Sequence, residues 1–171
     1  IFATVPTRRT LVFACYAGEE QGLYGSLGHM QALLASGDLP RIKLAVIMDM
    51  IGFSGDADLD YLLESSGTAA QLAVLNTFAQ LGADYAPGGR TVIDTNPCCS
   101  DHMPWINQGV PALLTIENDW SAYTHYHRST DLPQNMTNAQ PMAGKILRTN
   151  AAGIATWAEL VDADLLINGF E

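Results

Sequence analysis

The chain has 171 residues, 48% of them hydrophobic, which is enough for one domain with a substantial buried core. Its 8 basic and 18 acidic residues give a formal net charge of −10, and this balance argues against nucleic-acid binding, which depends on clustered Lys and Arg. No run reaches the roughly 18 apolar residues of a membrane span, so neither nucleic acid nor a membrane is an expected partner.

Segments with strand-like and helix-like patterns alternate along the chain. Residues 10–17 (TLVFACYA) form an apolar run typical of a central strand covered on both faces, which predicts that Cys15 is buried. A helix is expected over residues 26–36, ending at Gly37. Residues 43–50 (KLAVIMDM) then predict a second buried strand.

The middle of the chain continues the alternation. A short strand is expected over residues 61–64, followed by a helix over residues 68–81 that Gly82 would stop. Residues 87–100 are polar and rich in Gly and Pro, which predicts a loop. Residues 101–108 predict a short helix.

The last part of the chain completes the pattern. Residues 111–117 (PALLTIE) predict a third buried strand, residues 118–134 a long loop, and residues 138–161 a final amphipathic helix. Strands separated by helices predict a three-layer α/β sandwich around a mostly parallel, mixed sheet, formed by residues 1–171 as one domain.

Charged side chains follow each of the three long predicted strands. Glu19 and Glu20 come after the first, Asp49 lies near the end of the second, Glu117 ends the third, and His127 lies in the loop beyond. Ligands in open α/β sheets gather beyond the carboxyl ends of the strands, so we expect these groups to converge. Adjacent carboxylates repel unless a cation or proton lies between them, and zinc binds Asp, Glu and His.

Each of these side chains also has an interpretation without a metal. The pair Glu19 and Glu20, taken alone, is more often a solvated turn. Asp49 lies in an apolar run, and burying it without a partner would cost several kcal/mol, so either an ordinary polar partner or a metal would suit it. His125 and His127 lie in a polar loop, where surface histidines are common.

The Ser-Asp-His run at residues 100–102 resembles a piece of a catalytic triad. Adjacent residues cannot form the line of nucleophile, base and orienting group that a triad needs. A helix-capping role for Ser100 or Asp101 is the simpler interpretation.

The cysteines do not suggest a thiolate metal site. There are three, with no C-x-x-C pair. Cys98 and Cys99 are adjacent, and neighbouring cysteines seldom bond each other without strain, so the sequence leaves open whether either forms a disulfide.

Five short motifs, in order, resemble those of the bacterial co-catalytic di-zinc aminopeptidase family, which is related to the glutaminyl cyclases. The first, at residues 16–26 (YAGEEQGLYGS), is similar to the family's G/A-E-E-x-G-L-x-G-S signature. The others lie at residues 48–52 (MDMIG), 100–105 (SDHMPW), 109–112 (GVPA) and 127–131 (HRSTD). Together they cover most of the chain.

The resemblance implies a zinc-dependent aminopeptidase acting on peptide substrates. Glu19 would be the general base that takes a proton from a metal-activated water and passes it to the leaving amine. Glu20 and His127 would bind one zinc and Asp49 the other, with His127 preferred over His125 for its spacing to the acid at position 131. Two further matched residues would orient the site, namely Ser100 and Asp101.

An apolar pocket for the amino-terminal side chain of the substrate is expected near these motifs. The residues that would line it are Met50, Ile116, Trp120, Tyr123 and Tyr126.

The sequence also departs from the family pattern. The family's first His ligand and its bridging Asp lie upstream of the Glu-Glu signature, whereas residues 1–9 contain no His, Asp or Glu. We therefore expect a fragment lacking the N-terminal portion of the domain, inactive alone and binding at most one zinc weakly. Its possible partner is the missing N-terminal part. Because most bacterial relatives are exported, the resemblance implies a secreted or periplasmic protein.

Two other functions remain open at this point. A glutaminyl cyclase-like acyltransferase uses a single zinc held by one Asp, one Glu and one His, and Glu20, Asp49 and His127 supply that set. A non-catalytic binding member of the same fold is the third interpretation, although retention of all these groups together with Glu19 speaks against it.

Overall fold

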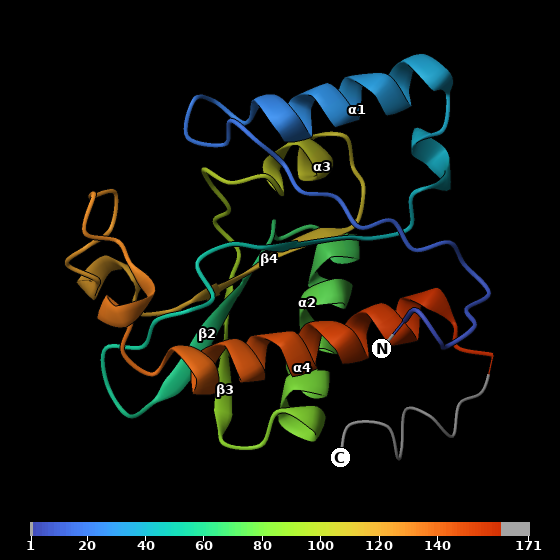
Figure 1. Ribbon diagram of the computed structural model, residues 1–171. Helices are drawn as coiled ribbons and strands as arrows, with labels where there is room; N and C mark the ends of the chain where they lie inside the picture. The colour runs from blue at the N-terminus through green and yellow to red at the C-terminus, as the bar shows by residue number, and fades with distance from the viewer. Residues whose placement is uncertain (1, 162–171) are drawn as a thin grey trace.

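The computed structural model describes residues 2–161, which form a four-stranded mixed sheet (Figure 1). The strands are β1 (Ala45–Met48), β2 (Leu59–Glu64), β3 (Gly89–Asp94) and β4 (Ala112–Glu117), arranged in the order β1-β4-β2-β3. β1 and β4 are parallel, β2 and β3 are parallel, and β2 runs antiparallel to β4. The carboxyl ends of β1 and β4 therefore meet at one edge of the sheet.

Helices cover both faces of this sheet, as Figure 1 shows. On one face lie α1 (Tyr24–Ser36) and α3 (Met103–Asn107), and on the other lie α2 (Ala69–Tyr85) and α4 (Ala139–Ala158). Each layer has its own apolar cluster. Phe78 and Leu113 belong to the cluster beneath α2 and α4, and Met30 and Trp105 to the one beneath α1 and α3. The predicted three-layer sandwich is confirmed.

Local sequence signals account for two of the helix ends. Gly37 ends α1 with φ of 76°, a left-handed conformation that costs glycine nothing. The Thr68 hydroxyl caps α2 by accepting the N–H of Gln71 at 3.4 Å. Within residues 2–161 no helix is both long enough and apolar enough to cross a bilayer.

The expected helix stop at Gly82 is wrong, because α2 continues through this residue to Tyr85. A Cβ at position 82 would lie 2.8 Å from both the Thr91 methyl group and the Tyr61 hydroxyl. Glycine is present here because the helix and the sheet approach closely, and not because the helix ends.

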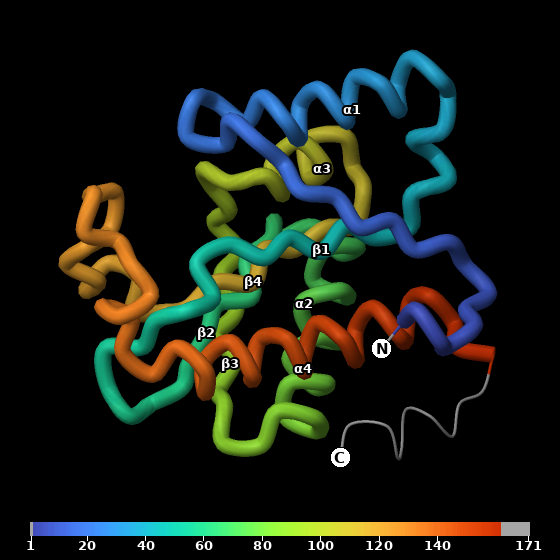
Figure 2. Tube along the Cα trace, viewed as in Figure 1, coloured from blue at the N-terminus to red at the C-terminus, as the bar shows by residue number. Residues whose placement is uncertain are grey.

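The expected strand over residues 10–17 is also wrong, because this segment has no strand partner among residues 2–161. Val12 and Phe13 are 72% and 76% exposed, and Cys15, which was expected to be buried, is exposed. Figure 2 shows the segment as an open stretch of chain leading to α1. An apolar run forms a strand only where neighbouring strands satisfy its backbone groups.

The expected loop over residues 87–100 contains a strand that the pattern did not predict. Residues Gly89–Asp94 form β3, at the edge of the sheet beside β2. Its side chains mix polar and apolar types, so β3 lacked the continuous apolar run that predicted β1 and β4.

The long loop after β4 projects from the end of the molecule where β1 and β4 finish (Figure 2). It contains two short 3₁₀ turns, η2 (Trp120–Ala122) and η3 (Pro133–Asn135), on either side of His127. A further 3₁₀ turn, η1 (Leu39–Arg41), joins α1 to β1.

Candidate active site

Asp49 lies where β1 ends and is held from two directions. Its backbone N–H donates to the Thr115 carbonyl of β4 at 3.3 Å. Its carboxylate accepts a hydrogen bond from the Ser100 hydroxyl at 2.9 Å. Ser100, which was expected to orient the site, thus contacts Asp49 directly. The expected capping of α3 by Ser100 or Asp101 does not occur.

The pair Glu19 and Glu20 lies in a tight turn before α1. The N–H groups of Gly22 and Leu23 both donate to the Glu19 carbonyl at 2.9 Å, which closes the turn. A Cβ on Gly25 would approach the Ala17 backbone to 2.7 Å, so only glycine lets the first turn of α1 pack against the segment before it. The Gly-rich motif is therefore a structural requirement for placing the two carboxylates.

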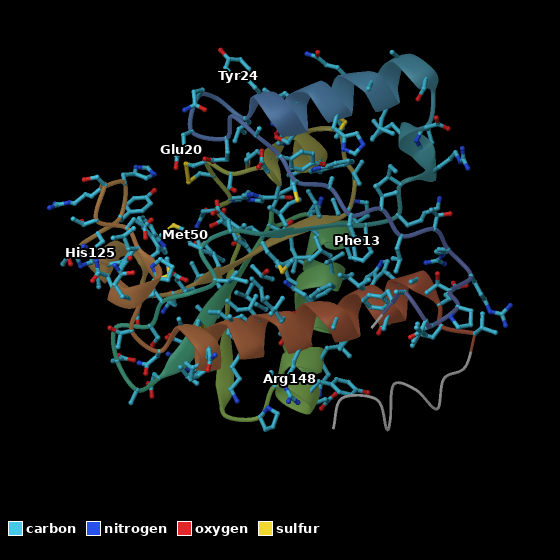
Figure 3. The ribbon with its side chains drawn as sticks, in the orientation of Figure 1. Phe13, Glu20, Tyr24, Met50, His125 and Arg148 are labelled. Carbon is cyan, nitrogen blue, oxygen red and sulfur yellow. A yellow bond between two sulfur atoms is a disulfide. The ribbon has the colours of Figure 1, made fainter. Side chains whose placement is uncertain are left out.

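His127 meets Glu20 across a sequence separation of 107 residues. The Nε2 atom of His127 lies 2.8 Å from Oε1 of Glu20, and both side chains are more than half exposed. The Tyr126 ring stacks on the His127 ring at a centroid distance of 3.8 Å and limits its rotation. Figure 3 shows Glu20 and Met50 at the end of the molecule from which the loop carrying His125 projects.

The carboxylates at this edge raise the proton affinity of Glu19. Burial raises the pKa of Glu19 above its ordinary value, and the charges of Glu20, Asp49 and Asp101 raise it further, while His127 opposes the shift. These contributions show that Glu19 shares one electrostatic environment with the other groups. A divalent cation placed among them would reverse the effect by favouring the ionised forms.

The donor chemistry of the pair Glu20 and His127 fits zinc. Carboxylate oxygen and imidazole nitrogen are ordinary zinc ligands, and the two facing atoms are close enough to contact one ion. Among residues 2–161, however, no group of three or more His, Cys, Asp or Glu side chains is arranged to hold a metal ion. The described residues thus provide part of a site, and the role of Asp49 as a ligand stays a prediction.

The residues expected to line a substrate pocket separate into smaller groups. Trp120 and Tyr126 form an edge-to-face pair at 5.8 Å. Tyr123 is buried and packs at 4.7 Å on Phe53, which the sequence analysis did not propose. The two remaining residues are Ile116, buried within β4, and Met50, which follows Asp49 with φ of 46°.

Asp101 and His102 lie behind the site and do not form a triad with Ser100. Asp101 is buried, and its Oδ1 atom has no hydrogen-bond partner within the described residues. His102 is fully buried, with Nε2 at 3.0 Å from Oε1 of Glu64. The same Glu64 oxygen accepts the N–H of Cys98 at 2.9 Å and so fixes the chain just before Ser100.

Cys98 and Cys99, whose pairing the sequence left open, form a disulfide with each other. Cys99 adopts φ of 73°, a backbone conformation that few residues other than glycine adopt. Ser100 follows directly, with its N–H donating to the Cys98 carbonyl at 3.0 Å. The pairing therefore lies within the turn that presents Ser100 to Asp49.

Glu117 is a site residue to which sequence analysis assigned no role. It ends β4, is 2% exposed, and accepts the Phe53 N–H at 2.9 Å. Burial raises its pKa to about 7, although hydrogen bonds from the backbone of Phe53 and Gly52 oppose the shift. The position of Glu117 at the end of an apolar strand was the sequence signal that could have identified it as a site residue. No sequence signal indicated Phe53.

Acidic groups and a histidine at the edge of an α/β sheet are typical of hydrolases that use a metal ion. The chain matches the model of peptidase family M28 over residues 1–152, and it belongs to that family. The match confirms the resemblance drawn from the five motifs.

Similar proteins point the same way. The probable leucine aminopeptidases of Arthroderma benhamiae and Trichophyton verrucosum are each 29% identical over 134 residues, covering 76% of this chain and 34% of theirs. The Legionella pneumophila LapA aminopeptidase is 25% identical, with a TM-score of 0.73 over 92% of this chain and 42% of its own.

Two further solved structures share the fold. BSAP, a zinc aminopeptidase from Bacillus subtilis, is 19% identical with a TM-score of 0.73, over 90% of this chain and 37% of its own. A glutaminyl cyclase from an Acidobacteriales bacterium is 21% identical with a TM-score of 0.58, over 77% of this chain and 45% of its own. The chain spans about a third of the length of the curated relatives that it matches.

Proposed function

We propose that the protein containing this chain is a zinc-dependent aminopeptidase that removes the amino-terminal residue of peptides. The observation that carries the proposal is the contact between Glu20 and His127, which brings a carboxylate and an imidazole together beside Glu19 in a chain of family M28. These are the residue types that a hydrolytic zinc site needs, and they lie 107 residues apart in the sequence.

Glu19 is the proposed general base. It is half-buried, and its raised pKa brings its proton affinity closer to that of a working acid–base group. It would accept a proton from the attacking water and donate it to the departing amine. Bound zinc would supply a Lewis acid that polarises the scissile carbonyl.

Three side chains would hold the metal ions in this proposal. Glu20 and His127 would bind one, and Asp49 the other, with Ser100 fixing the carboxylate of Asp49 through its hydroxyl. The remaining ligands would come from the part of the protein outside this chain. Asp101, buried behind Glu19, would orient the site through its charge.

The aromatic loop supports an apolar amino-terminal side chain as the preferred substrate feature. Trp120 and Tyr126 offer one ring pair next to His127, while Phe53 and Tyr123 form another beside the Asp49 loop. With Met50 and Ile116, they would form the walls of the substrate pocket.

The test is the substitution Glu19→Gln in the complete protein. This change keeps the size of the side chain and removes its ability to accept a proton. We expect hydrolysis of amino-acid p-nitroanilides to fall by about 100- to 10,000-fold, while the zinc content stays unchanged. The control is Glu159→Gln, which changes an exposed acid paired with Arg9 far from the site. Unchanged hydrolysis by the Glu19 variant would remove it from the mechanism.

The isolated chain is proposed to be inactive and to bind zinc poorly. The support is that residues 2–161 bring together a pair of ligand side chains and no larger group. The measurement is hydrolysis by the purified 171-residue chain in the presence and absence of zinc. Zinc-dependent peptidase activity from the chain alone would refute this part of the proposal.

A glutaminyl cyclase-like activity is the second candidate, favoured by the likeness to a solved glutaminyl cyclase. The Glu19–Glu20 pair and the Gly-rich continuation of its motif favour the peptidase. Metal analysis of the complete protein separates the two, because two zinc ions per chain support the peptidase and one supports the cyclase.

Export from the cytoplasm is also proposed. The disulfide between Cys98 and Cys99 supports it, because disulfides persist in oxidising compartments. Cell fractionation with an antibody against the protein is the measurement. Recovery of the mature protein only from the cytosol, with both thiols free, would contradict export.

A further inference from the structure

Glu117 is a carboxylate buried at the edge of the sheet where Asp49 lies. Its side chain is 2% exposed, and no Lys or Arg within the described residues forms an ion pair with it. A buried carboxylate is costly unless hydrogen bonds compensate, so its partners show what holds it there.

Those partners are all in the short loop after β1, residues 49–53. The Phe53 N–H donates to Oε2 of Glu117 at 2.9 Å, and the backbone of Gly52 also hydrogen-bonds to the carboxylate. The Glu117 N–H donates in turn to the Met50 carbonyl at 3.1 Å. Glu117 of β4 thus binds three residues of this loop.

The loop needs such support because of its conformation. Met50 has φ of 46°, which non-glycine residues seldom adopt without external contacts. Asp49 precedes Met50, and the Asp49 carboxylate accepts a hydrogen bond from the Ser100 hydroxyl. Phe53, at the other end of the loop, packs against Tyr123.

We propose that Glu117 is a positioning residue that fixes the 49–53 loop, and with it both the Asp49 carboxylate and the Phe53–Tyr123 wall. This inference rests on the proposed function for its catalytic consequence, because Asp49 is there the ligand of one metal. Glu117 does not touch substrate. It acts by accepting hydrogen bonds from the backbone of Gly52 and Phe53, which a side chain without an acceptor could not do.

A purely space-filling role for Glu117 makes a different prediction. Leucine has a similar size, so Glu117→Leu would then be tolerated at least as well as Glu117→Gln. If accepting hydrogen bonds is what matters, glutamine retains one acceptor oxygen for the loop and leucine retains none. The order of the two variants therefore separates the two roles.

The experiment compares Glu117→Gln, Glu117→Leu and the control Thr149→Val in the complete zinc-loaded protein. Thr149 is fully buried in α4 and bonds to the Tyr61 hydroxyl at 2.6 Å, so its replacement removes a buried hydrogen bond away from the loop. The readouts are kcat, KM, zinc affinity by chelator competition, and hydrogen exchange at the Phe53 amide.

We expect Glu117→Leu to lower kcat and zinc affinity by about 10- to 100-fold and to speed exchange at Phe53. Glu117→Gln should recover a large part of each loss, and Thr149→Val should resemble the parent. Equal effects of Leu and Gln, or unchanged exchange at Phe53 in the Leu variant, would overturn the inference. An inactive parent protein would instead count against the proposed function, while the exchange at Phe53 would still decide the role of Glu117.

Discussion

Glu117 makes the stability of the metal-free protein depend on pH in an unusual direction. Burial raises its pKa in the folded state to about 7, from an ordinary value of 4.5 that we assign to the unfolded chain. Between these two values the folded protein holds a proton that the unfolded protein has lost. Stability is therefore fully present below pH 4.5 and falls as pH rises toward 7.

The size of this loss follows from the two pKa values. At about 1.4 kcal/mol for each tenfold change in proton affinity, the full difference is about 3 kcal/mol. Relaxation and water near the carboxylate reduce such effects, so we expect about 1 to 2 kcal/mol. The nearby charges of Asp49 and Asp119 also raise the pKa of Glu117.

The assay is urea unfolding of the parent and of Glu117→Gln in chelator at pH values from 5 to 8. Glutamine resembles the protonated carboxyl group, so the two proteins should be similar near pH 5. The variant should be more stable by about 1 to 2 kcal/mol at pH 8. Thr149→Val should instead shift the free energy of unfolding equally at every pH. Parallel curves for the parent and Glu117→Gln would show that Glu117 is ionised in the fold and would refute the reasoning.

Three further changes have defined expected results. Gly153→Ala places a methyl group into the ring of the fully buried Phe78, and should lower the free energy of unfolding by about 1 to 3 kcal/mol in urea denaturation. Ser100→Ala removes the hydrogen bond to the Asp49 carboxylate, and should weaken zinc binding of the complete protein by about 10- to 100-fold in chelator competition, with little change in the thermal midpoint of the metal-free protein. Thr68→Ala removes the α2 cap, and should cost about 1 kcal/mol by the same urea assay.

The central elements of the fold were predictable because each carries a pattern that depends on one physical rule. The apolar run that became β4 is buried throughout, whereas the run that became β1 is only partly buried, with Met48 47% exposed. Gly37 correctly marked the end of α1. The edge strand β3 was missed because its side chains mix polar and apolar types and form no continuous apolar run. Gly82 was misjudged because close packing and helix termination both favour glycine, and sequence alone does not separate them.

Strand formation over residues 10–17 failed for a non-local reason. The run has the composition of a covered strand, yet strand formation also requires hydrogen-bonding neighbours, and residues 2–161 provide none for it. Composition reports what a segment can bury, whereas pairing depends on the rest of the sheet.

The location of the site was predictable because its charged residues follow the ends of predicted strands. Placing Glu20 near His127 required only that the charged groups after each strand gather at one edge, together with the family motifs. Phe53 and the disulfide at Cys98 were beyond such reasoning, because ring packing and the pairing of neighbouring cysteines depend on backbone angles that no local pattern fixes.

The edge of the sheet concentrates more negative charge than its own contacts compensate. The charges of Glu20, Asp49 and Asp101 raise the proton affinity of Glu19, and the imidazole of His127 opposes this effect. The charges of Glu19, Glu20 and Asp49 likewise raise the proton affinity of Tyr126. A fold selected for stability alone would replace some of these carboxylates with apolar or neutral side chains. Their retention at one edge is explained if a cation completes the site, because the repulsion that weakens the metal-free protein then becomes attraction for the ion. The same clustered carboxylates therefore lower the stability of the metal-free chain and raise the metal affinity of the complete protein.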